Sequence, residues 1–184
     1  MSHTCALYFG SFNPIHYGHI SIAKYLLDNE GIDEVRFILS PKNPLKKMED
    51  LEDANNRLAS LRKTVDNIII ENNYTEKQVT VSDIEFTMST PRYTLKTLKK
   101  IISQDPETNF ILVIGGDNIT IIEKWYGWKE LLTNYEIWVY PRVGYEDKLA
   151  CRLYNHSFKD IKLRYLEDAP KYNISSTELR LRKK

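Results

Sequence analysis

Residues 4–31 read TCALYFGSFNPIHYGHISIAKYLLDNEG. The run at residues 4–9 is short, apolar and aromatic, and Gly10 ends it, as is typical of a buried strand that leads into a loop. Beyond the loop, apolar residues recur at helical spacing, namely Ile20, Ala23, Leu26 and Leu27, and Gly31 offers a helix stop. A second apolar run at residues 35–39 then completes a β-α-β unit.

The rest of the chain continues this alternation. Apolar runs predict strands at residues 110–114, 136–140 and 161–166, and apolar alternation predicts one at residues 79–86. Helical spacing predicts helices at residues 55–65, 94–102 and 176–182. The near-continuous apolarity of residues 110–114 is typical of a parallel strand that is covered on both faces. We therefore expect one domain, residues 1–184, with an α/β, Rossmann-like, doubly wound fold: a mostly parallel sheet with helices on both faces.

Composition excludes several classes of partner. The chain has 26 Lys and Arg against 25 Asp and Glu, so its net charge gives no reason to expect nucleic acid or an anionic membrane as partner. Its apolar runs are far shorter than the ~20 residues of a membrane-spanning helix, and its first residues lack a secretion signal. We expect a cytoplasmic protein. Two cysteines, Cys5 and Cys151, are too few for a disulfide framework, and we assign no role to residues 144–160.

Glycines mark the expected ligand site. Only seven occur in 184 residues, and four of them follow two of the predicted strands. Gly10 and Gly18 lie in the loop after the first strand, and Gly115 and Gly116 follow residues 110–114. In parallel α/β sheets, ligands bind beyond the carboxyl ends of the strands. Glycine allows close approach of the backbone, and a helix N-terminus there favours an anion.

His16 and His19 stand three residues apart at the start of the first helix, so their side chains can share a face. Imidazoles can donate hydrogen bonds to phosphate, and a nearby anion favours their cationic form, which would offset charge on a leaving pyrophosphate. The alternatives are a metal pair or surface histidines. The metal alternative lacks partners nearby in sequence, and His156 stands alone, so we predict no protein metal site.

Two segments together resemble the signatures of the nucleotidyltransferase superfamily. Residues 10–19, GSFNPIHYGH, are similar to its His-x-Gly-His motif, and residues 174–180, ISSTELR, are similar to its second motif. The resemblance implies catalytic roles for His16, His19 and Arg180. It also implies ATP or phosphate binding by a group of loop residues: Gly10, Ser11, Phe12, Gly18, Ser175, Ser176 and Thr177. Hydroxyl side chains at a helix start suit an anion site, although an ordinary capped helix is the alternative.

Three further segments resemble bacterial nicotinate mononucleotide adenylyltransferases: residues 41–46, 90–98 and 114–126. The resemblance implies that Lys46 contacts phosphate as a catalytic residue. It assigns the mononucleotide to Tyr93, Thr94, Gly115, Asp117, Trp125 and Tyr126. A carboxylate such as that of Asp117 can accept hydrogen bonds from both hydroxyls of a ribose, and an indole can stack on a pyridine ring. The alternative for Trp125 is packing on a helix face, which we expect for Trp128, while Trp138 is expected in the core.

The chain departs from that family at two positions. It has Leu45 where members often carry histidine, and Arg92 where they often carry serine. Arg92 is open to two interpretations, a solvated lid residue or a positive charge that favours an acidic pyridine. Preference for nicotinate over nicotinamide is therefore a hypothesis.

The resemblance implies an enzyme of NAD biosynthesis whose partners are small molecules, ATP and nicotinate mononucleotide. The mononucleotide phosphate would attack the α-phosphorus of ATP without a covalent intermediate, and Mg²⁺ would bind through the ATP phosphates. The alternatives are phosphopantetheine adenylyltransferase, a cytidylyltransferase, or a nucleotide-binding sensor without turnover. The sequence gives no oligomeric state.

Overall fold

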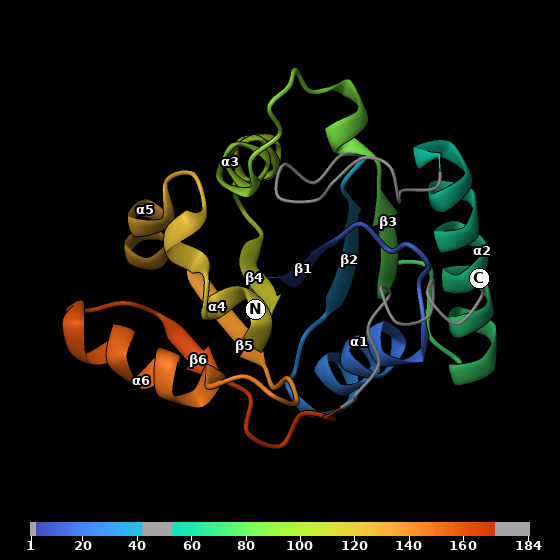
Figure 1. Ribbon diagram of the computed structural model, residues 1–184. Coiled ribbons are helices and arrows are strands. Elements are labelled where there is room, and N and C mark those ends of the chain that lie inside the picture. Colours follow the sequence, from blue (N-terminus) through green and yellow to red (C-terminus); the bar gives the residue numbers. More distant parts are fainter. Residues whose placement is uncertain (1–2, 42–52, 172–184) are drawn as a thin grey trace.

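The computed structural model describes residues 3–41 and 53–171 (Figure 1). Within these residues, six strands form one parallel sheet in the order β3-β2-β1-β4-β5-β6. The strands are β1 Thr4–Gly10, β2 Glu34–Leu39, β3 Val79–Ser82, β4 Asn109–Gly115, β5 Glu136–Tyr140 and β6 Leu163–Tyr165. This is the strand order of the Rossmann fold, and it reverses between β1 and β4. The predicted fold class is confirmed.

Helices cover both faces of the sheet (Figure 1). They are α1 Tyr17–Asn29, α2 Ala54–Asn72, α3 Thr94–Gln104, α4 Gly116–Ile119, α5 Trp128–Asn134 and α6 Asp147–Ser157, with short 3₁₀ helices η2 Ile84–Thr87 and η3 Ile122–Lys124. Ala6 and Tyr8 of β1 pack in one core with α1 and α2. Cys5 and Leu7 pack in the other with α3, α5 and α6. Successive side chains of a strand point to opposite faces, so the uniformly apolar β1 serves two cores.

The register of the central strands brings the two glycine loops together. Thr4 pairs with Asn109, and the same offset continues to the pair of Tyr8 with Val113. Extended by two more residues, the same offset sets Gly10 level with Gly115. The loops that follow β1 and β4 therefore leave the sheet side by side, at the point where the strand order reverses.

Three predicted elements differ from the observed ones. The strand expected at residues 79–86 ends at Ser82, because the hydroxyl of Ser82 accepts a hydrogen bond from the Ile84 N–H (3.3 Å) and turns the chain into η2. Helix α2 continues beyond the predicted residue 65 to Asn72, with Asn73 in the left-handed conformation as its C-cap. The last strand is shorter than residues 161–166. The predicted helix at residues 176–182 lies outside the described residues.

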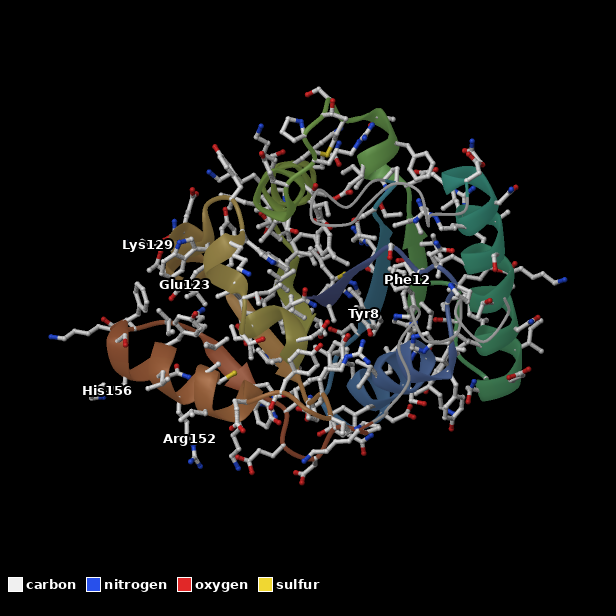
Figure 2. All side chains as sticks on the ribbon, viewed as in Figure 1. Tyr8, Phe12, Glu123, Lys129, Arg152 and His156 are labelled. Atoms are coloured by element: carbon white, nitrogen blue, oxygen red, sulfur yellow. The ribbon has the colours of Figure 1, made fainter. Side chains whose placement is uncertain are left out.

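The expected core position of Trp138 is confirmed, because its side chain is buried. Cys5 and Cys151 are also buried. The side chains of Tyr8 and Phe12 lie close to one another in the interior, whereas Arg152 and His156 project outward from α6 (Figure 2). In residues 3–41 and 53–171, every helix is too short or too polar to cross a membrane.

Candidate active site

His16 and His19 form a reciprocal cap at the start of α1. His16 is the N-cap residue, and its Nδ1 accepts a hydrogen bond from the Gly18 N–H (3.2 Å). Nδ1 of His19 accepts in turn from the His16 N–H (3.2 Å), and the two ring centroids are 3.8 Å apart. This capping box is usually made by Ser or Thr with Glu or Gln. Because both Nδ1 atoms accept, each neutral ring carries its proton on Nε2, so the cap fixes two Nε2–H donors.

The environment of His16 keeps its ring neutral. Burial, together with the positive charge of Arg142, lowers the pKa of His16 to about 4. His16 therefore offers a neutral N–H group near pH 7, and the predicted shift toward the cationic form beside an anion stays a prediction. Its buried Nε2 has no hydrogen-bond partner among the described residues. A buried donor without a partner costs about 1–3 kcal/mol, so such a group calls for a functional explanation.

Phe12 holds the first loop in place from inside the core. Its φ angle is 40°, and its side chain is only 2% exposed. The ring packs against His19, with centroids 5.2 Å apart, and against Phe37 at 5.4 Å. A Cβ atom at Gly10 would lie 2.8 Å from this ring. Any phosphate contact by Phe12 would therefore have to come from its main chain, and its side chain supports His19.

Arg57 joins the loops that follow β1 and β2, and sequence reasoning missed it. It is 1% exposed and donates hydrogen bonds to main-chain carbonyls of both loops: Ser11, Ser40 (3.1 Å) and Pro41 (2.7 Å). An arginine in the first turn of a helix looks like a solvated residue in the sequence. No local signal showed that it would be buried.

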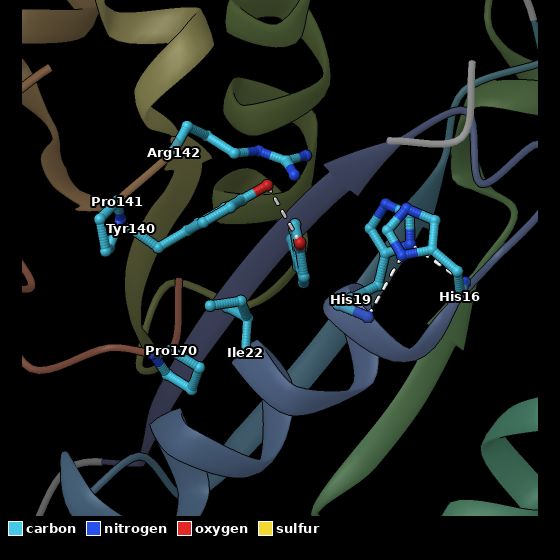
Figure 3. Close-up of a pocket in the computed structure, with 9 residues that line it drawn as sticks. His16, His19, Ile22, Tyr140, Pro141, Arg142 and Pro170 are labelled. Atoms are coloured by element: carbon cyan, nitrogen blue, oxygen red, sulfur yellow. Dashed lines mark hydrogen bonds between the residues drawn. The ribbon is translucent and has the colours of Figure 1, made fainter. Parts of the chain in front are cut away.

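A pocket lies beside the histidine pair, with walls from β1, α1 and the end of β5 (Figure 3). Its lining residues are Tyr8, His16, Gly18, His19, Ile22, Tyr140, Pro141, Arg142 and Pro170. Three were predicted: His16, Gly18 and His19. The hydroxyl of Tyr8 donates to that of Tyr140 (3.1 Å) across the pocket floor. Arg142 could have been found by one signal, since it follows the carboxyl end of a strand, as the predicted site loops do.

Asp117 and Arg142 link the ends of β4 and β5. Nε of Arg142 lies 3.4 Å from Oδ1 of Asp117, and its guanidinium group lies 5.4 Å from the centroid of the Tyr140 ring. The Arg142 N–H donates to Oδ2 of buried Asp147 (2.7 Å). Asp147 opens α6 and lies within residues 144–160, to which we assigned no role from the sequence. It also fills the space beside Gly116, where a Cβ atom would lie 1.9 Å from Oδ2 of Asp147.

The other predicted mononucleotide residues gather between α3 and η3. The rings of Tyr93 and Tyr126 stack with centroids 4.5 Å apart and planes 14° apart, and Lys96 lies over both rings. Thr94 is the first residue of α3. Trp125 is half-buried against the core, and its Nε1 has no hydrogen-bond partner among the described residues.

The positions of Trp128 and Arg92 decide between the alternatives that the sequence left open for each. Trp128 packs against Tyr154 and Phe158, as expected for a helix-face residue. Arg92 donates through Nε to the Glu85 carbonyl and is half-buried, which is against its interpretation as a solvated lid residue.

Five predicted site residues lie outside the described residues: Lys46, Ser175, Ser176, Thr177 and Arg180. In residues 3–41 and 53–171, no three or more His, Cys, Asp or Glu side chains are grouped as ligands for a metal ion.

Comparison with known proteins places the chain among nucleotidyltransferases. The sequence profile of the family described as cytidylyltransferase-like matches residues 7–182. A protein of Flavobacterium psychrophilum named probable nicotinate-nucleotide adenylyltransferase is 36% identical over 174 residues, which are 95% of this chain and 83% of the relative. A protein of the same name from Bacteroides fragilis is 35% identical over 175 residues, 95% of this chain and 79% of the relative.

Solved structures show the same fold. Nicotinic acid mononucleotide adenylyltransferase of Plasmodium falciparum, complexed with NaAD, superposes with a TM-score of 0.72 at 22% identity, covering 96% of this chain and 82% of that one. The same enzyme complexed with APC gives a TM-score of 0.70 at 21% identity, covering 96% and 81%.

Proposed function

This chain belongs to the cytidylyltransferase-like family, and we propose that it is a nicotinate-nucleotide adenylyltransferase of NAD biosynthesis. It transfers the adenylyl group of ATP to nicotinate mononucleotide and releases pyrophosphate. The observation that carries this proposal is the pair of fixed Nε2–H donors on His16 and His19 at the switch point of the sheet. It occurs in a chain that aligns over 95% of its length with relatives of that name.

The chemistry needs alignment and charge neutralisation more than a base. A phosphate monoester has a second pKa near ~6, so the mononucleotide phosphate is largely dianionic at pH 7. One of its oxygens forms a bond to the α-phosphorus of ATP while the bond from that phosphorus to the oxygen that bridges the α- and β-phosphates breaks. Pyrophosphate leaves with the electron pair of that bond. In this scheme His16 and His19 donate to phosphate oxygens, more strongly as charge develops on the leaving group.

The mononucleotide is proposed to occupy the side of the site formed by β4, α3 and η3. Asp117 accepts from the ribose hydroxyls, Trp125 stacks on the pyridine ring, and the turn of Tyr93 and Thr94 meets the ring carboxylate. Within residues 3–41 and 53–171 the buried Nε1 of Trp125 has no hydrogen-bond partner, and this supports a ligand on this side. By family resemblance, further contacts to the phosphate groups come from residues outside the described part: Lys46, Ser175, Ser176, Thr177 and Arg180. ATP enters as its magnesium complex, the metal held mainly by phosphate oxygens and water.

A pyrophosphate-release assay tests the proposal directly. The purified chain is incubated with Mg²⁺, ATP and nicotinate mononucleotide, and the dinucleotide is identified by mass. We expect stoichiometric dinucleotide and pyrophosphate. Parallel reactions with nicotinamide mononucleotide and phosphopantetheine measure kcat/KM for each acceptor. Equal values for the two pyridines would reject the preference for the acid, and turnover with phosphopantetheine alone would replace the proposed substrate. Binding of ATP without turnover of any acceptor would indicate a sensor.

A further inference from the structure

We propose that Arg142 is a further substrate-binding residue, whose guanidinium group donates to a phosphate oxygen of the nucleotide held by His16 and His19. This inference rests on the proposed function, because it assumes a nucleotide in the histidine pocket. Arg142 has no counterpart in the motifs that the sequence singled out. The fold places it in the wall of the pocket that His16 and His19 also line.

Position is the first argument. Arg142 lines the same pocket as His16, Gly18 and His19, although it comes from the opposite wall, at the end of β5. Figure 3 shows its side chain extending over Tyr140 toward the side of the pocket on which the two imidazole rings lie. A phosphate that accepts from the Nε2–H groups would therefore lie between the histidine pair and the guanidinium group.

Charge is the second argument. Arg142 is the one Arg or Lys among the described residues that line this pocket. It is close enough to His16 for its positive charge to contribute to the lowered pKa of that ring. Since His16 is neutral near pH 7, it supplies a dipole, and Arg142 supplies a full charge. Hydrogen bonds from a charged donor to phosphate are roughly twice as strong as those between neutral groups.

The third argument is that the Arg142 side chain is already held in place. The main chain of Arg142 is fixed by Asp147, and its side chain, 19% exposed, lies against the Tyr140 ring and the carboxylate of Asp117. The ion pair to Asp117 runs through Nε, and a guanidinium group carries five N–H donors in a planar fork. Arg142 can thus keep Asp117 on one side while it meets phosphate with its outer nitrogens. A cation that is already held in place loses little freedom on binding.

The competing explanation is that Arg142 only positions Asp117. A double-mutant cycle separates the two: Arg142→Gln, Asp117→Asn and the double variant, with kcat/KM measured by pyrophosphate release. Arg142→Lys tests for partial rescue by charge. Arg152→Gln, an exposed arginine on α6, is the control with the same change of net charge. Thermal unfolding of each variant reports folding.

We expect Arg142→Gln to lower kcat/KM about 10²-fold, both in the wild-type chain and in the Asp117→Asn variant, as is typical for one donor to developing charge. Arg142→Lys should recover part of the loss, and Arg152→Gln should leave kcat/KM unchanged. If Arg142→Gln has no effect in the Asp117→Asn background, the proposal is overturned.

Calorimetric titration with magnesium and ATP tests the role of Arg142 by binding alone, so its result does not depend on the proposed reaction. We expect Arg142→Gln to raise the Kd for ATP several-fold, and an unchanged Kd would also overturn the proposal. A wild-type chain that made no dinucleotide, yet lost affinity for ATP in this variant, would reject the reaction and uphold the role of Arg142.

Discussion

The two ends of the parallel sheet both bury charged groups, and they differ in how fully those groups are hydrogen-bonded. At the amino end, the carboxylate of Glu34 accepts from Arg36 (2.8 and 2.9 Å), from the Thr80 hydroxyl and from His3 (3.2 Å). Burial alone would raise the pKa of Glu34, but the hydrogen bonds from Arg36 and Thr80 outweigh it and lower the pKa to about 2.

At the carboxyl end, the hydrogen bonding is incomplete. Nε2 of His16 and Nε1 of Trp125 are buried without partners among the described residues. Because a native interior rarely leaves such atoms unpaired, their grouping at one end of the sheet distinguishes a ligand site from a structural cluster. A buried polar cluster whose groups are all hydrogen-bonded to one another contributes stability. A cluster that leaves donors unpaired can bind a substrate.

Replacement of His19 should have the largest effect. His19→Ala removes a donor whose interaction strengthens toward the transition state, so we expect kcat to fall about 10²–10³-fold. It also removes the acceptor of the His16 N–H, so the unfolding temperature should fall as well. His156→Ala removes an exposed histidine on α6 and is the matched control. Steady-state pyrophosphate release measures both. An unchanged kcat in His19→Ala would mean that the carboxyl end is as structural as the amino end.

Replacement of Glu34 should affect stability and leave catalysis intact. Glu34→Gln removes the charge that Arg36 and Thr80 stabilise, and we expect a loss of about 1–3 kcal/mol in the free energy of unfolding near pH 7. The pKa of Glu34 is lowered in the folded chain, so this stabilisation is present above pH ~4.5 and is lost as the pH falls toward 2. Urea unfolding at several pH values should show the two chains converging in acid. A constant difference, or a lower kcat, would contradict the separation of the two ends.

Replacement of Trp125 should have the smallest effect of the three. Trp125→Ala removes ring stacking worth about 0.5–1.5 kcal/mol, so we expect KM for nicotinate mononucleotide to rise roughly 2–10-fold. Trp125→Phe keeps an aromatic face and loses Nε1, and it should lie between wild type and alanine. Initial rates at varied mononucleotide and saturating ATP measure the change. Should KM stay the same in both variants, Trp125 would be a core residue.

The fold could be predicted from the sequence because its signals are local. The apolar runs of β1 and β4 and the helical spacing of α1 each lie within a few residues, and their sum specifies a doubly wound sheet. The strand expected through residues 79–86 was wrong because one hydroxyl, that of Ser82, diverts the backbone, and apolar alternation does not register a single hydrogen bond.

The site could be predicted only where it follows a motif. The histidine pair was found, but its reciprocal cap and the neutral state of His16 depend on burial and on Arg142, which is distant in the sequence. Arg57, Arg142 and Asp147 were missed because each looks like an ordinary charged residue until the tertiary fold brings its partners to it. The predicted roles of Lys46 and Arg180 stay predictions.

Because Gly116 contacts Asp147, the substitutions that are tolerated at one of these positions depend on the residue at the other. A side chain can enter at residue 116 only if the carboxylate of residue 147 retreats, and that carboxylate anchors the main chain of Arg142. Sequence drift at this glycine is therefore epistatic with the first residue of α6. A descendant that altered residue 116 alone would disturb the far wall of the pocket beside the histidine pair while leaving every residue that lines it unchanged.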